Sequence, residues 1–234
     1  MTDLDGARVL VTGASGGLGS LLAGGMAQRG ARVVVSGRDE QRLRALDVEA
    51  AAHLPADLRQ PGAPEELVGA ATDALGGLDV LVHAAGAVAF GPAVEADDDL
   101  LDEMLLLHYL APARLLRAAA PHLRASASDR GGSLAVMLSA VVAEQPVAGM
   151  AAYSAAKAAL TAFDAAVAKE LRKEKVRVLD VRPPHTETGL ADRAVAGSAP
   201  RMPQGKAPQA VVDRILRAVA DDERDLSSSA FDGG

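Results

Sequence analysis

The chain has 234 residues, no cysteine and a formal net charge of −7 at pH 7. Its length fits one α/β domain with a sizeable core, and the absence of cysteine excludes disulfides and thiolate metal sites. The acidic balance disfavours nucleic acid and anionic membranes as partners, and no apolar run is long enough for a membrane span or a signal core. We therefore expect a cytoplasmic protein.

The N-terminal segment predicts a phosphate-binding turn. Residues 7–12 form a short apolar, β-branched run typical of a buried parallel strand, and residues 20–29 have the apolar spacing of a helix. The glycine-rich stretch between them allows a tight turn and close approach of the backbone to a pyrophosphate, which the helix N-terminus favours. An ordinary structural loop is the alternative. The residues expected to contact the cofactor here are Gly13, Ser15, Gly16, Gly17, Leu18 and Gly19.

The second expected strand, residues 32–36, leads to Arg38, where the adenosine ribose of a dinucleotide would lie. An acidic residue at this place usually marks NAD, and a nearby arginine accommodates the 2′-phosphate of NADP. The sequence therefore favours NADP(H). NAD(H) stays possible because Asp39 and Glu40 follow directly, and Arg38 on a solvated loop is the alternative.

Strand and helix patterns alternate along the rest of the chain. We expect further strands at 53–56, 79–83, 133–138 and 176–181, and helices at 41–52, 64–75, 151–173 and 207–220. A long helix is expected from Glu95 or Asp97 to about Ala125, with a kink at Pro112. This alternation predicts a single α/β domain with a doubly wound, mostly parallel Rossmann-type sheet of six to seven strands. The tail adds a short edge strand or is disordered, and residues 189–206 form a mobile substrate loop or an ordinary connection.

A catalytic site is predicted at the start of the helix 151–173. Tyr153 and Lys157 are four residues apart, so both side chains project from one face of the helix. A nearby ammonium favours the phenolate, and we expect Lys157 to lower the tyrosine pKa. Ser139, which follows an apolar strand, could donate to a substrate oxygen. A chance pairing on a helix and a turn serine are the alternatives.

These motifs, in this order, resemble the short-chain dehydrogenase/reductase family over nearly the whole chain. Thr12-Gly-Ala-Ser-Gly-Gly-Leu-Gly19 is similar to the coenzyme motif of the family, Asp57 to its adenine-contacting aspartate, and His83-Ala-Ala-Gly86 to a variant of its Asn-Asn-Ala-Gly motif. The other cofactor contacts that the resemblance implies are Leu58, Ala84, Ala85, Gly86, Tyr153, Lys157, Pro183, Thr186 and Thr188.

The resemblance also implies a mechanism. Tyr153 would exchange a proton with the substrate oxygen, Ser139 would orient the carbonyl, and Lys157 would hold the nicotinamide ribose. Hydride would pass to or from the cofactor.

Three residues depart from the family pattern. His108 stands where the family usually has an asparagine of a proton relay; an imidazole can carry protons or hold a water, and a packed histidine without a role is the alternative. His83 and Ala84 replace the asparagines of Asn-Asn-Ala-Gly, and Pro184 replaces a glycine, which restricts the loop beside the nicotinamide.

We therefore expect an NADP(H)-preferring carbonyl reductase or alcohol dehydrogenase, free of metal, that acts on a small carbonyl or alcohol and forms a homodimer or homotetramer. The oligomer rests on the family resemblance alone. The alternative is a non-catalytic dinucleotide-binding redox sensor of the same fold. The chain is too short for the substrate domain of an extended-type epimerase, and a methyltransferase would leave Tyr-x-x-x-Lys unexplained.

Overall fold

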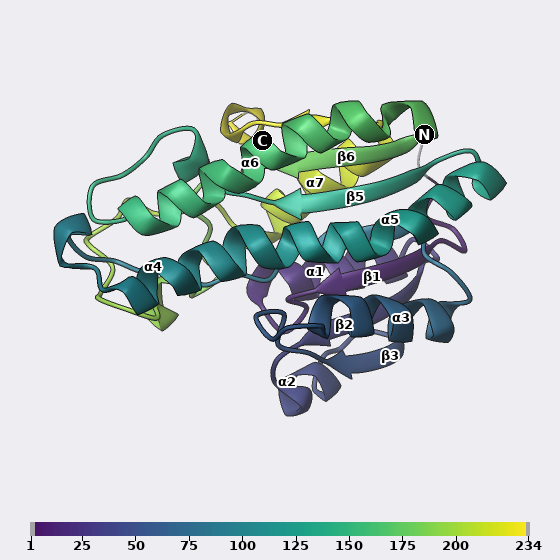
Figure 1. Ribbon diagram of the computed structural model, residues 1–234, viewed down its shortest axis with the longest axis horizontal. Helices are drawn as coiled ribbons and strands as arrows, with labels where there is room; N and C mark the ends of the chain where they lie inside the picture. Colours follow the sequence, from purple (N-terminus) through teal and green to yellow (C-terminus); the bar gives the residue numbers. More distant parts are fainter. Residues whose placement is uncertain (1–2, 233–234) are drawn as a thin grey trace.

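Seven strands form one parallel sheet, in the order β3-β2-β1-β4-β5-β6-β7, in the computed structural model, which describes residues 3–232 (Figure 1). The strands are β1 (Arg8–Thr12), β2 (Arg32–Gly37), β3 (Ala50–Pro55), β4 (Val80–His83), β5 (Ser133–Leu138), β6 (Val176–Val181) and β7 (Asp225–Leu226). The predicted doubly wound sheet is confirmed, and the tail supplies the edge strand β7. The strand order reverses between β1 and β4, and ligands of such sheets bind at the carboxyl ends of the strands near this point.

Helices cover both faces of the sheet (Figure 1). The helices are α1 (Gly17–Ala27), α2 (Glu40–Arg44), α3 (Ala63–Leu75), α4 (Asp98–Leu105), α5 (Ala111–Arg130), α6 (Ala151–Leu171) and α7 (Pro208–Ala220). Buried side chains of α1 and α7 pack on one face, and those of α3, α5 and α6 pack on the other. Both clusters consist mainly of Val, Leu and Ala, as the low aromatic content requires.

The predicted helix over residues 41–52 is wrong beyond its first turn. Helix α2 ends at Arg44, and Ala50–Pro55 forms the strand β3 instead. Alanine favours helices, but β2 would otherwise expose a row of unpaired backbone groups, and pairing with β3 satisfies them. Because β3 is the edge strand, Pro55 sits where a missing backbone donor is tolerated, as its sequence position suggested.

The long helix predicted over residues 97–125 is divided by one π turn, Leu106–Leu110, between α4 and α5. The backbone N–H of Ala111 donates to the carbonyl of Leu106, five residues back. Pro112 has no N–H, and the ladder is therefore interrupted just before it, which accounts for the irregularity predicted there. This turn carries His108, whose side chain is buried.

The segment 189–206 is joined to the body of the protein by backbone hydrogen bonds. Phe90 donates to Ala196, and Val195 donates to Val88, which fixes the middle of the segment. At its end, Lys206 donates to the carbonyl of His185. The segment therefore closes over the carboxyl ends of the strands in this structure, and its mobility stays a prediction.

Candidate functional site

One cavity of about 750 Å³ lies at the carboxyl ends of the central strands. It is lined by the glycine turn after β1, the ends of β4 and β5, the start of α6 and the loop after β6. The predicted site residues that line it are Gly13, Ser15, Gly16, Gly17, Leu18, Gly19, Arg38, Asp57, Leu58, Ala84, Ala85, Gly86, Ser139, Tyr153, Lys157, Pro183, Thr186 and Thr188. His108 lies behind this lining rather than in it.

The glycine turn is a close-packed cradle. Gly13 has φ +70°, and a Cβ there would lie 2.5 Å from the carbonyl carbon of Ala84. A Cβ on Gly17 would lie 2.7 Å from the Cβ of Thr188, so the turn also touches the loop after β6. Helix α1 begins at Gly17 without a side-chain cap, which leaves its first N–H groups available to an anion.

Two arginines lie at the end of the cavity beside β2. Arg38 was predicted as a cofactor contact, whereas Arg42 in α2 was missed. Arg42 Nη2 donates to the carbonyl of Ser15 over 2.7 Å, which positions its guanidinium beside the glycine turn.

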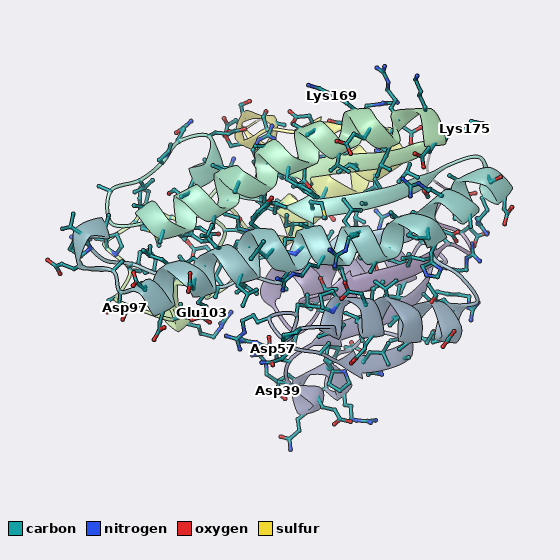
Figure 2. The ribbon with its side chains drawn as sticks, viewed as in Figure 1. Asp39, Asp57, Asp97, Glu103, Lys169 and Lys175 are labelled. Carbon is teal, nitrogen blue, oxygen red and sulfur yellow. The ribbon has the colours of Figure 1, made fainter. Side chains whose placement is uncertain are left out.

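Asp39 and Glu40, the two acidic residues that kept NAD(H) possible, both make contacts within α2. Figure 2 shows Asp39 at the start of α2, where its carboxylate caps the helix by accepting from the N–H of Arg42 over 3.0 Å. Glu40 accepts from Arg44 over 2.7 Å. These contacts favour a basic rather than an acidic environment at the ribose end of the cavity.

Asp57 belongs to an ion-pair bridge that the sequence did not predict. Arg59 donates to both carboxylate oxygens of Asp57 and, over 2.6 Å, to Glu103 of α4; Figure 2 labels the two acids. The hydrogen bonds from Arg59 hold the pKa of Asp57 below its usual range. The bridge ties the loop after β3 to α4, the helix that leads to the π turn.

Tyr153 and Lys157 are both buried at the start of α6, 8% and 4% exposed. Lys157 Nζ donates to the carbonyl of Leu138 over 2.7 Å and lies 5.9 Å from the centre of the Tyr153 ring. Burial lowers the pKa of Lys157 to about 8, against the opposing charges of Asp180 and Asp164. Burial also raises the pKa of Tyr153, so the lowering expected from Lys157 is not found in this structure.

Ser139 does not direct its hydroxyl toward Tyr153. Its Oγ donates to the carbonyl of Lys157 over 3.1 Å and lies 2.8 Å from the Oγ1 of Thr161. Both partners belong to α6, so Ser139 fastens this helix to the end of β5. Ala140, the next residue, also lines the cavity.

We predict that Ser139→Ala leaves kcat within about threefold of the wild-type value and lowers the free energy of unfolding by ~1 kcal/mol, because the lost contacts are structural hydrogen bonds. Steady-state assays and urea unfolding of the two proteins measure this. A fall in kcat of about 100-fold with unchanged unfolding would show that the hydroxyl acts on the substrate.

His108 and His83 are buried neutral imidazoles. His108 Nε2 lies 2.8 Å from the carbonyl of Ala87, and its ring packs edge-on against Tyr153 with 5.1 Å between the ring centres. Burial lowers the pKa of His108 well below its usual value. Burial likewise lowers the pKa of His83 to about 3, and its Nδ1 lies 3.0 Å from the Oγ1 of Thr12.

Tyr153 belongs to an apolar cluster at the cavity. The cluster members that also line the cavity include Val88, Phe90, Val142, Met150 and Leu190, whereas Arg193, Gln204 and Lys206 add polar groups to the lining. Within residues 3–232, no group of three or more histidine or acidic side chains is arranged to hold a metal ion. In the same range, no helix is long and apolar enough to cross a membrane.

Sequence comparison identifies relatives over most of the chain. A family model described as short chain dehydrogenase matches residues 7–198. A Bos taurus protein named hydroxysteroid 11-beta-dehydrogenase 1-like protein is 34% identical over 206 residues, which cover 85% of this chain and 69% of that protein.

Solved structures share the fold. A 3-ketoacyl-(acyl-carrier-protein) reductase from Brucella melitensis, complexed with NADH, has a TM-score of 0.86 at 23% identity and covers 96% of this chain and 97% of that one. A short chain dehydrogenase from Burkholderia cenocepacia, in complex with NADP, has a TM-score of 0.83 at 23% identity. The match covers 97% of this chain and 90% of that one.

Proposed function

Since the chain belongs to the short chain dehydrogenase family, we propose that it is an NADP(H)-preferring oxidoreductase that reduces a carbonyl to an alcohol, or runs the reverse reaction. The observation that carries this proposal is the shared cavity: Tyr153 and Lys157 line the same space as the glycine cradle. A proton donor and a dinucleotide site are therefore within one enclosure.

The lining of the cavity fits a nicotinamide dinucleotide. Gly13 to Gly19 and the start of α1 would hold the pyrophosphate, and Arg38 with Arg42 would hold the 2′-phosphate of NADP. From the family resemblance, Asp57 would accept from the adenine amino group and Lys157 would hold the nicotinamide ribose. The reduced dinucleotide supplies a hydride when it is bound.

Tyr153 donates the proton to the substrate oxygen in the reductive direction. Burial keeps this hydroxyl protonated until the transfer, since it raises the tyrosine pKa. The Lys157 ammonium, oriented by the carbonyl of Leu138, favours the phenolate that remains. The apolar walls around Tyr153 exclude water and suit a small or apolar substrate.

The test is NADPH oxidation, followed by absorbance, against a panel of ketones, aldehydes, β-ketoacyl thioesters and quinones, with NADH run in parallel. We expect turnover with at least one carbonyl and a higher kcat/KM with NADPH. Turnover that prefers NADH would remove the cofactor preference from the proposal and retain the reaction.

A second candidate is a redox sensor that binds the dinucleotide without turnover. Two observations favour it. The hydroxyl of Ser139 is hydrogen-bonded to residues of α6, and His108 replaces the asparagine of the family. Tight NADPH binding in calorimetry together with no oxidation by any member of the panel would establish this function.

A further inference from the structure

One row of aligned residues crosses the sheet beneath α6. The parallel register places Thr12 of β1 beside His83 of β4, His83 beside Met137 of β5, and Met137 beside Asp180 of β6. Aligned residues of neighbouring strands point to the same face. Met137 packs in the cluster that α3, α5 and α6 cover, so Asp180 faces α6.

The side of α6 that faces this row of residues is polar. Lys157, Thr161 and Asp164 follow each other at helical spacing and share one face of the helix. The Oγ1 of Thr161 lies 2.8 Å from the Oγ of Ser139, which joins this face of α6 to the end of β5. Lys157 is 4% exposed and Asp164 is 1% exposed, so bulk solvent screens their charges weakly.

The two carboxylates are incompletely partnered. Neither oxygen of Asp164 has a hydrogen-bond partner, and neither has the Oδ1 of Asp180, whereas its Oδ2 accepts from Arg182. Burial raises the pKa of both groups, and their mutual repulsion adds to this for Asp164. Two buried carboxylates in one place favour a state in which one of them keeps a proton.

The other charged or titratable groups around Lys157 carry no negative charge. They are His83 on β4, His108 in the π turn, Tyr153 on α6 and Arg182 at the end of β6. The two histidines and the tyrosine are neutral, and Arg182 is neutralised by Asp180 together with Glu144 and Asp225. The negative charge that opposes the burial of Lys157 therefore comes from Asp180 and Asp164.

We propose that Asp164 and Asp180 form a buried carboxylate pair that holds one proton, with the charge on Asp180, and acts as the counter-ion of Lys157. The pair positions and charges the lysine and does not touch the substrate. This inference rests on the proposed function only in so far as that function uses Lys157 as a cation.

The direct test is the titration of the lysine side chains by NMR, with ¹³C at the ε-carbon; the chain has five lysines, and Lys157→Arg identifies the resonance of Lys157. We expect its midpoint near pH 8 in the wild-type protein. In Asp180→Asn the midpoint falls by about one pH unit, because a nearby negative charge is lost. In Asp164→Asn it moves by less than about half a unit, because the residue removed carried the proton.

The matched control is Asp225→Asn, which removes a carboxylate from the same Arg182 at an exposed position. Its Lys157 midpoint stays within about 0.2 of the wild-type value because solvent screens that charge. If Asp180→Asn leaves the midpoint unchanged, or if Asp225→Asn shifts it equally, the proposal is overturned. Should Asp180→Asn fail to fold, Asp164→Asn decides: a midpoint that moves by less than about half a unit supports the proposal, and one that falls by about a full unit overturns it.

The pH profile of activity gives a second readout. The ammonium is present below the pKa of Lys157, so kcat/KM with NADPH falls as pH rises through about 8, and this limb moves to lower pH in Asp180→Asn by the shift that NMR records. If the wild-type protein reduces no carbonyl, the proposed function fails, and the NMR titration still decides the inference.

Discussion

Tyr153→Phe is expected to lower kcat for carbonyl reduction by about 10³-fold, within the range of general acid catalysis, while NADPH affinity stays within about threefold. The hydroxyl is the proposed proton donor, and the phenyl ring keeps the contact with His108. The pair of measurements is steady-state NADPH oxidation and calorimetric titration with NADPH.

The chain supplies a matched control, because Tyr109 is its other tyrosine and packs edge-on against Phe163 with 6.0 Å between the ring centres. Tyr109→Phe leaves kcat near the wild-type value. Equal kcat in the Tyr153→Phe and wild-type proteins would contradict the assignment of the proton donor.

Arg38→Ala is expected to lower kcat/KM with NADPH by about 10- to 100-fold and to change the value with NADH by less than about threefold. A charge-assisted hydrogen bond contributes about 1.5–3 kcal/mol, and only NADPH carries the phosphate that receives it. Arg42→Ala acts in the same direction with a smaller effect, because its guanidinium also holds the carbonyl of Ser15.

Arg44→Ala is the control for charge, since Arg44 pairs with Glu40 on the exposed side of α2. It leaves the ratio of the two cofactors unchanged. An Arg38→Ala variant that loses NADPH and NADH activity to the same extent would show that this arginine maintains the fold or the pyrophosphate site instead.

The sequence was sufficient for the sheet and for many of the residues that line the cavity, although Arg42 was missed and His108 lies behind the lining. Buried parallel strands produce apolar runs with few alternatives, and the glycine turn after β1 requires residues such as Gly13 with a positive φ. The same runs could not set the boundary between α2 and β3, because alanine suits both states and the open edge of β2 decided between them.

Side-chain direction was the harder part of the site. Ser139 continues the alternation of β5, on the side of Met137, and α6 packs on this side, so the hydroxyl is bonded to α6 although the residue lines the cavity. The alternation of side chains along β5 therefore indicates the direction of the Ser139 hydroxyl, whereas the spacing between Ser139 and Tyr153 does not. The buried acids Asp164 and Asp180 had no sequence signature, since their meaning depends on the register between β5 and β6.

Isotope tracing distinguishes hydride transfer inside this cavity from other routes of NADPH oxidation. The protein is incubated with NADPH that carries deuterium at the transferable position of the nicotinamide and with a carbonyl that the panel identifies, and the alcohol is analysed by mass spectrometry. We expect one deuterium on the former carbonyl carbon for each NADPH oxidised, and we expect the Tyr153→Phe protein to form the deuterated alcohol only at its residual rate. Oxidation of NADPH without deuterium in the alcohol would contradict it.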